Sequence, residues 1–117
     1  MLSGKQILKR NRKGGEKDMM LMPSYVEKKL PPLYSKDNEK DPKVLCKFFL
    51  PFTKWTWYAI EFDGKDTFIG YVVGDFPELG YFSLKELKEI EGPYGIGVER
   101  DMYFDPCPLS EVKRIHE

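Results

Sequence analysis

The chain has 117 residues, of which 41% are apolar and 32% charged, with a formal net charge of zero, as is typical of one globular domain. No apolar run approaches the ~20 residues that a membrane-spanning helix requires, and the N-terminus has no apolar segment of a secretory signal, so we expect a soluble cytoplasmic protein without a membrane partner. The single histidine, His116, excludes catalytic triads built on histidine, and Cys46 and Cys107 are too far apart in sequence to form a metal-binding motif.

Charge is divided unevenly along the chain. Residues 1–17 have six basic side chains and one acidic one, so the other hundred residues have 13 basic and 18 acidic side chains and a net charge of −5. This basic segment has too few apolar residues to pack, and residues 1–18 are therefore predicted to form a disordered leader, which could bind nucleic acid. An alternative is that translation starts at Met19, Met20 or Met22, because the preceding KGGEKD can be encoded by a purine-rich, ribosome-binding-like stretch.

The first elements after this leader are a short helix and a buried strand. The segment PSYVEKKL, residues 23–30, is apolar along one face and is followed by Pro31-Pro32, which predicts a short helix that ends there. The polar residues 34–42 are expected to form a loop. The apolar run KVLCKFFLPF then predicts a buried strand that Pro51 stops.

Residues 55–73, WTWYAIEFDGKDTFIGYVV, predict a β-hairpin around Asp63-Gly64, because both turn residues accept the positive φ of a type I′ turn. A two-residue turn fixes the register with the cross-strand pairs Phe62 with Lys65, Glu61 with Asp66, and Trp57 with Gly70. The indole of Trp57 is then expected to lie against the Gly70 backbone. Both faces of the hairpin are apolar, so we expect two central strands that are covered on each side.

The C-terminal third predicts a strand, a capped helix, a further strand and a terminal helix. The strand ELGYFS precedes the helix LKELKEIE, whose start is marked by a capping box of Ser83 with Glu86 and whose end is marked by Gly92. The segments IGVERDMYF and LSEVKRI predict the last strand and the last helix. This order indicates an α+β fold for residues 19–117: a single small domain with an antiparallel sheet of about four or five strands and two or three short helices.

Three blocks of the sequence resemble one known bacterial family. They are KKLPPLYS, KFFLPFTKWTWYAIEFDGKDTFIGYVVGDFPELGYFSLKELKEI and GVERDMYFDPCPLSEV, and with them about residues 20–113 are similar to the small proteins of domain of unknown function 2958. Such proteins are often encoded on plasmids, conjugative elements and phages, sometimes beside antirestriction genes. The resemblance implies no catalytic residue, but it favours a role linked to mobile genetic elements.

Four carboxylates are candidates for a divalent-cation site. In the predicted register Glu61 and Asp66 lie opposite each other, where like charges repel and a cation would relieve the repulsion. Glu99 and Asp101 of the segment VERD could complete a set of oxygen ligands. The alternative, which we favour, is a solvated turn without a cofactor, screened by Lys47, Lys65 or Arg100.

Arg100 has two interpretations. It alternates with the acidic residues of its strand and shares a side with the apolar Val98, so we expect it to form a buried ion pair with Glu61 or Asp63. The alternative is that its planar guanidinium binds an anion.

Trp55 and Trp57 are candidate binding residues. Lys54 directly precedes Trp55, and Lys47 belongs to the strand predicted before them. Exposed rings beside cations could stack on the bases of single-stranded nucleic acid, and exposed aromatics are equally typical of protein-binding hot spots. Trp57 is expected to belong to the core, whereas Trp55, at the strand end, is the more open candidate.

Three functional hypotheses follow. The first is a non-enzymatic protein-binding or adaptor module, associated with mobile genetic elements, whose partner is a protein. The alternative is a nucleic-acid-binding protein that uses Trp55, Lys54 and the basic leader. A second alternative is a metal-dependent hydrolase that uses the four carboxylates.

Overall fold

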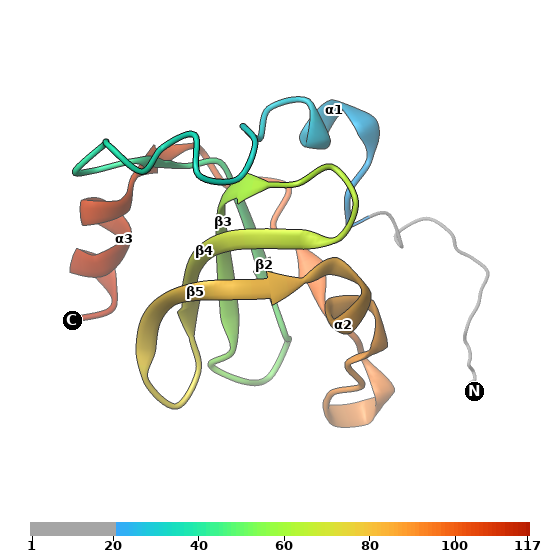
Figure 1. Cartoon of the computed structure of the whole chain (residues 1–117). Helices are drawn as coiled ribbons and strands as arrows, with labels where there is room; N and C mark the ends of the chain where they lie inside the picture. The colour runs from blue at the N-terminus through green and yellow to red at the C-terminus, as the bar shows by residue number, and fades with distance from the viewer. Residues whose placement is uncertain (1–20) are drawn as a thin grey trace.

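The computed structural model describes residues 21–117, and the predicted leader of residues 1–18 lies outside them (Figure 1). The helical elements are α1 (Ser24–Glu27), α2 (Leu84–Glu89), the 3₁₀ turn η1 (Pro93–Gly95) and α3 (Leu109–Ile115). The strands are β1 (Lys43–Val44), β2 (Cys46–Phe49), β3 (Thr56–Phe62), β4 (Thr67–Val73), β5 (Pro77–Ser83), β6 (Glu99–Arg100) and β7 (Cys107–Pro108). None of the helices in this part of the chain is long and apolar enough to cross a membrane.

The strands form two antiparallel sheets. The larger has the order β5-β4-β3-β2-β6, and β1 pairs with β7 in a separate two-stranded sheet. The fold is therefore α+β, as the order of elements predicted. The last strand of the larger sheet, β6, has only two residues and is shorter than the pattern indicated.

The larger sheet is covered on both faces, and β3 is its buried centre. All seven residues of β3 are buried. One face packs against α1 and α2 in a cluster that includes Trp57 and Phe68, and the other packs against β1 and α3 in a cluster that includes Tyr58 and Ile60. Figure 1 shows α2 and α3 on opposite sides of the sheet. The prediction that the hairpin is central and covered on each side is therefore confirmed.

The turn between β3 and β4 is longer than predicted, and this changes the register. Asp63 Oδ1 accepts three backbone hydrogen bonds within the turn, from the N–H groups of Lys65 (2.8 Å), Asp66 (2.8 Å) and Thr67 (3.0 Å). Gly64 supplies the positive φ of 83° that the turn requires. The last cross-strand pair is Phe62 with Phe68, so the five residues 63–67 lie between the paired positions, and the predicted two-residue type I′ turn was wrong.

A β-bulge changes the register of β3 a second time. Pairing with β4 shifts by one residue between Ala59 and Glu61, which leaves Ile60 as the extra residue of the bulged strand. Glu61 consequently lies opposite Ile69 and not opposite Asp66. The repulsion between two facing carboxylates, on which the predicted cation site depended, does not arise.

Gly70 is required for close packing, but it does not lie beneath Trp57. A Cβ atom at Gly70 would lie 1.9 Å from the carbonyl oxygen of Tyr58 on the neighbouring strand. The indole that lies against a glycine is that of Trp55, since a Cβ atom at Gly74 would lie 2.2 Å from its ring. The predicted pairing of Trp57 with Gly70 was therefore wrong, for the same reason as the register.

The start of α2 contains the residues of the predicted capping box, but its end does not lie at Gly92. Ser83 Oγ accepts a hydrogen bond from the N–H of Glu86 at 3.2 Å. Ile90 follows the helix with an extended backbone and is its C-cap. Gly92 lies further on, where a Cβ atom would be 2.7 Å from Leu50 Cδ1. Its role is to admit Leu50 to the core and not to cap the helix.

Candidate functional site

Glu61 is a buried structural residue and not an exposed ligand. The residue is only 2% exposed. Its two carboxylate oxygens accept hydrogen bonds from the backbone N–H groups of Tyr34 and Lys36, each at 2.7 Å. These bonds attach the loop of residues 31–42 to the sheet. Both oxygens of this buried carboxylate are thus engaged by backbone donors, and Glu61 is not exposed to solvent from which a metal ion would bind.

Asp66 stabilises the start of α2. Its carboxylate accepts hydrogen bonds from the Ser83 hydroxyl at 2.6 Å and from the backbone N–H of Lys85 at 2.7 Å. The bond from Ser83 first, and the one from Lys85 second, hold the pKa of Asp66 below its ordinary value. Asp66 therefore acts with the N-cap of the helix and does not face Glu61.

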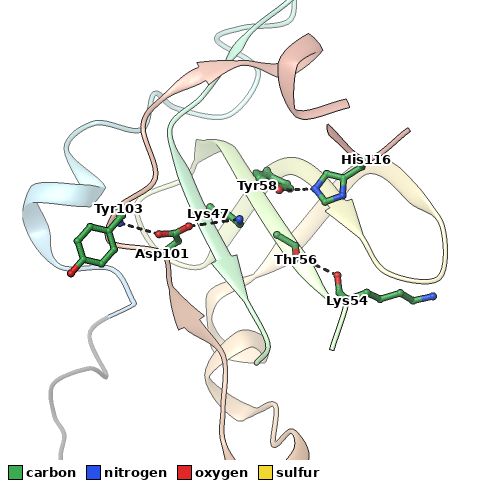
Figure 2. A network of polar contacts seen from close by, with 7 residues as sticks. All are labelled: Lys47, Lys54, Thr56, Tyr58, Asp101, Tyr103 and His116. Atoms are coloured by element: carbon green, nitrogen blue, oxygen red, sulfur yellow. Dashed lines mark hydrogen bonds and ion pairs between the residues drawn. The ribbon is translucent and has the colours of Figure 1, made fainter. Parts of the chain in front are cut away.

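Glu99 and Asp101 lie on and beside β6, at one edge of the sheet. Asp101 Oδ2 lies 3.7 Å from Lys47 Nζ, and Asp101 Oδ1 accepts a hydrogen bond from the N–H of Tyr103 at 2.9 Å (Figure 2). Within residues 21–117, no group of three or more His, Cys, Asp or Glu side chains is placed to hold a metal ion. Three of the four candidate carboxylates, Glu61, Asp66 and Asp101, are each engaged by a different part of the fold, and Glu99 is exposed on β6.

The two tryptophans differ in position. Trp57 is buried in the core, as expected, and its ring is not exposed for binding. Trp55 is 36% exposed and stacks on Trp57, with ring centroids 5.9 Å apart. The Nζ of Lys54 lies 3.9 Å from Oδ1 of Asp75, in the loop between β4 and β5. Lys47 lies over the ring of Tyr58, on the opposite face of the sheet. Lys47 therefore does not contribute to a base-stacking surface around Trp55.

Arg100 forms neither of the ion pairs expected of it. Glu61 and Asp63 are occupied by backbone donors, and in the described part of the chain no ion pair joins Arg100 to a carboxylate. Its guanidinium instead lies over the ring of Tyr25, 5.5 Å from the centroid, and Nη2 donates to the Tyr25 hydroxyl at 3.1 Å. The Nε of Arg100 is buried and has no hydrogen-bond partner among residues 21–117. The interpretation of Arg100 as a residue of a buried ion pair was wrong.

The outer side of β5 is a surface that the sequence did not single out. β5 is the terminal strand of the larger sheet and pairs with β4 along its whole length without a bulge. Leu79 and Tyr81 are 53% and 62% exposed, and Phe76 in the preceding loop is more exposed still. The Tyr81 hydroxyl lies 2.9 Å from that of Tyr34, so the loop of residues 31–42 borders the same surface. We call Phe76, Leu79, Tyr81 and the outer backbone of β5 the β5 edge.

Comparison with known proteins identifies the family. The family model described as Protein of unknown function (DUF2958) matches residues 19–115. The chain belongs to DUF2958. No curated protein and no solved structure matches the chain. The resemblance of the three sequence blocks to this DUF2958 family is therefore confirmed, whereas the link to plasmids and phages stays a prediction.

This DUF2958 protein also exposes aromatic rings at strained backbone positions. Phe52 and Tyr94 have φ of 68° and 62°, in a region that costs residues with a Cβ atom roughly 1–2 kcal/mol. Both are exposed, and their rings meet edge to face with centroids 5.2 Å apart. Tyr34, at φ 69°, is the third such residue within the described chain and is exposed as well. Strained positions of this kind are concentrated at functional sites more often than elsewhere.

None of these exposed rings was among the predicted site residues of this DUF2958 chain. The sequence pattern identifies a strand at residues 78–83 but does not show that it lies at an edge. The sequence signal for an edge position was Ser83. It is the N-cap of a helix that starts directly after the strand, so the chain leaves the sheet at this point. The positive φ of Phe52 and Tyr94 has no sequence signal, because neither residue is Gly or Asn.

Proposed function

We propose that this protein is a non-enzymatic, cytoplasmic protein-binding module of mobile genetic elements, and that its partner adds an extended segment to the β5 edge. The observation that carries the proposal is a seven-residue terminal strand with exposed apolar side chains. Such a strand presents a row of backbone donors and acceptors, which is the chemistry that recognises another extended chain.

The β5 edge has few of the features that prevent strand addition. Natural edge strands are blocked by lysines, prolines, bulges or inward-pointing charges. Pro77 and Glu78 supply such features at the start of β5, but residues 79–83 are Leu-Gly-Tyr-Phe-Ser and contain neither a charge nor a proline. Pairing with β4 is regular throughout. An incoming strand would therefore find about five residues of unprotected backbone, at a spacing of ~4.8 Å from β5.

Side chains beside this backbone can supply specificity. Leu79 and Tyr81 lie two residues apart and so point to the same face of the sheet. An added strand places alternate side chains directly beside them. We therefore expect the partner segment to have apolar or aromatic residues at alternate positions. The resemblance to proteins of plasmids and phages makes host-defence proteins the first partners to test.

The test is capture of partners from the native bacterium with the tagged full chain, after nuclease treatment and in moderate salt. We compare the wild type with Tyr81→Lys, which places a charge on the β5 edge, and with the matched control Ile115→Lys on α3, where the exposure of 60% is nearly the same. We expect a stoichiometric protein that the wild type and the control retain, and whose binding Tyr81→Lys weakens by about tenfold or more.

Three results contradict the proposal. Capture that is equal for Tyr81→Lys and Ile115→Lys would mean that the partner uses another surface. Recovery of nucleic acid alone, lost with nuclease or at higher salt, would favour a nucleic-acid-binding protein. Self-association through β5, detected as a concentration-dependent dimer that Tyr81→Lys abolishes, would replace the adaptor with a homodimer.

A further inference from the structure

A small pocket lies between α1 and β6. In the larger sheet β6 and β5 are the two outermost strands, so the pocket and the β5 edge lie at opposite ends of the strand order. It has a volume of about 130 Å³ and is lined by residues of α1 and β2 and by the segment from Arg100 to Phe104. A water molecule occupies about 30 Å³ in the liquid. The pocket therefore has room for a group of several heavy atoms, but not for a nucleotide.

Arg100 is one of the polar residues that line this pocket. Its Nε–H is buried without a hydrogen-bond partner in the part of the chain that the structure describes, although buried donors are almost always paired. Nη2 has two hydrogens and donates one bond to the Tyr25 hydroxyl, at 3.1 Å. Arg100 lines the pocket, so an acceptor that reaches its Nε would meet a donor left unpaired by the described residues, next to an Nη2 with a further N–H to donate.

The charges around the pocket favour an anion. Lys29 and Arg100 both line it, and the only carboxylate among its lining residues is Asp101. Oδ2 of Asp101 lies 3.7 Å from Nζ of Lys47 on β2, and Oδ1 accepts a hydrogen bond from the N–H of Tyr103. Both oxygens of this carboxylate therefore already have partners. Two cations consequently remain beside one carboxylate that is already partnered.

The other walls of the pocket are apolar and chemically inert. Val26, Leu45, Met102 and Phe104 contribute hydrocarbon, aromatic and thioether surface. Cys46 also lines the pocket, and burial raises the pKa of its thiol to about 12, so no thiolate is present to repel an anion or to act as a nucleophile. A charged head group with a short apolar stem suits these surroundings.

We infer that this pocket binds a carboxylate through the Nε and Nη2 of Arg100, with Lys29 as the second cation. The planar side of a guanidinium matches the two oxygens of a carboxylate, and such bidentate pairs are strong and geometrically specific. Two sources supply this chemistry: a free small organic acid, and an acidic side chain of a bound protein. The inference does not depend on the β5 edge.

The test is a titration of the isotope-labelled full chain by NMR, with the Nε–H resonance of Arg100 as the reporter. Acetate stands for the isolated head group, glutarate for a free organic acid, and N-acetylglutamate N-methylamide for an acidic side chain. Sodium chloride at equal ionic strength and inorganic phosphate are the reference anions. We expect a saturable shift of this resonance with acetate and with at least one of the two larger carboxylates. The larger carboxylate that saturates at lower concentration identifies the source.

Matched variants connect the binding to the proposed donors. Arg100→Lys keeps the charge but removes Nε, and we expect it to weaken carboxylate binding at least tenfold, by about the loss of one bidentate pair. Arg114→Gln, on α3 beside Glu111, removes a cation elsewhere and should leave binding unchanged. An unaltered amide spectrum away from the pocket shows that each variant is folded. A shift that follows ionic strength alone, equal responses to chloride and carboxylate, or undiminished binding to Arg100→Lys would overturn the inference.

Discussion

Replacement of Glu61 by glutamine tests whether the buried carboxylate is a structural acceptor. Glu61 accepts two backbone hydrogen bonds at 2.7 Å, from Tyr34 and Lys36, and bonds to a charged group contribute about 1.5–3 kcal/mol each. Glutamine keeps one acceptor oxygen, loses the charge, and places an NH₂ group against the second N–H. We expect Glu61→Gln to lower the free energy of unfolding by about 2–4 kcal/mol.

This loss can be measured because it is smaller than the stability of a typical domain, which is about 5–15 kcal/mol. Urea denaturation gives the free energy of unfolding, and hydrogen exchange of the Tyr34 and Lys36 amides reports whether the loop of residues 31–42 opens first. The matched control is Glu99→Gln, because Glu99 is an exposed carboxylate on β6. We expect the control to change stability by less than about 0.5 kcal/mol. A Glu61→Gln variant as stable as Glu99→Gln, with unchanged amide exchange, would refute the structural role.

Three further predictions concern packing and pH. Gly70→Ala should cost about 3 kcal/mol or more, because its Cβ would lie 1.9 Å from a backbone oxygen, whereas Gly80→Ala, with nothing within 4 Å, should be nearly neutral in urea denaturation. The lowered pKa of Asp66 predicts stability that is present above its unfolded value near 3.8 and is lost as the pH falls through its lower folded value. The pKa of His116 is lowered by burial first and by Lys47 second, so the unfolded chain binds the proton more readily, and stability should fall as the pH drops below about 6.5.

Variants separate the two pH effects. His116→Asn should abolish the pH dependence between about 6.5 and the folded pKa of His116 without altering the acid limb below pH 4. Asp66→Asn should do the reverse. An acid limb that persists in Asp66→Asn would show that other carboxylates, such as Asp63 with its three backbone hydrogen bonds, dominate it. A flat profile near pH 6 in the wild type would contradict the burial of His116 against Tyr58, whose hydroxyl lies 2.7 Å from Nε2 (Figure 2).

The fold class was readable from the sequence because apolar periodicity and turn residues are local signals. The alternation around Asp63-Gly64 placed a hairpin correctly, and its two apolar faces correctly predicted a covered sheet. The register was not readable. Asp63 uses its side chain to bond three backbone N–H groups, and the bulge at Ile60 depends on packing that no pattern of apolar residues encodes.

The candidate site was less accessible to sequence reasoning than the fold. Glu61, Asp66 and Asp101 were candidate metal ligands, beside the favoured alternative of a solvated turn, because carboxylates of one hairpin and one strand were expected to converge. In the structure each of these carboxylates accepts backbone N–H groups, Glu61 from the loop of residues 31–42, Asp66 from the start of α2, and Asp101 from the turn that follows β6. Backbone donors that lack a partner in a helix or sheet require such acceptors. Turn-rich small domains have many of these donors, so an acidic residue in such a chain is more often a structural acceptor than a metal ligand.

Both proposed sites are places where polar groups lack a partner among the described residues. Where the described chain satisfies its own polar groups, as at Glu61 and Asp66, nothing is left for a partner. Two places differ within the described residues 21–117: the outer backbone of β5 has no neighbouring strand, and Arg100 Nε has no acceptor. The first recognises an extended chain and the second a carboxylate. A protein partner with an extended apolar segment and an acidic side chain could occupy both, because the two sites lie at opposite ends of the sheet order and do not compete. Combining Tyr81→Lys with Arg100→Lys should then weaken capture of one partner by the product of the two separate effects, whereas separate ligands would respond to only one substitution each.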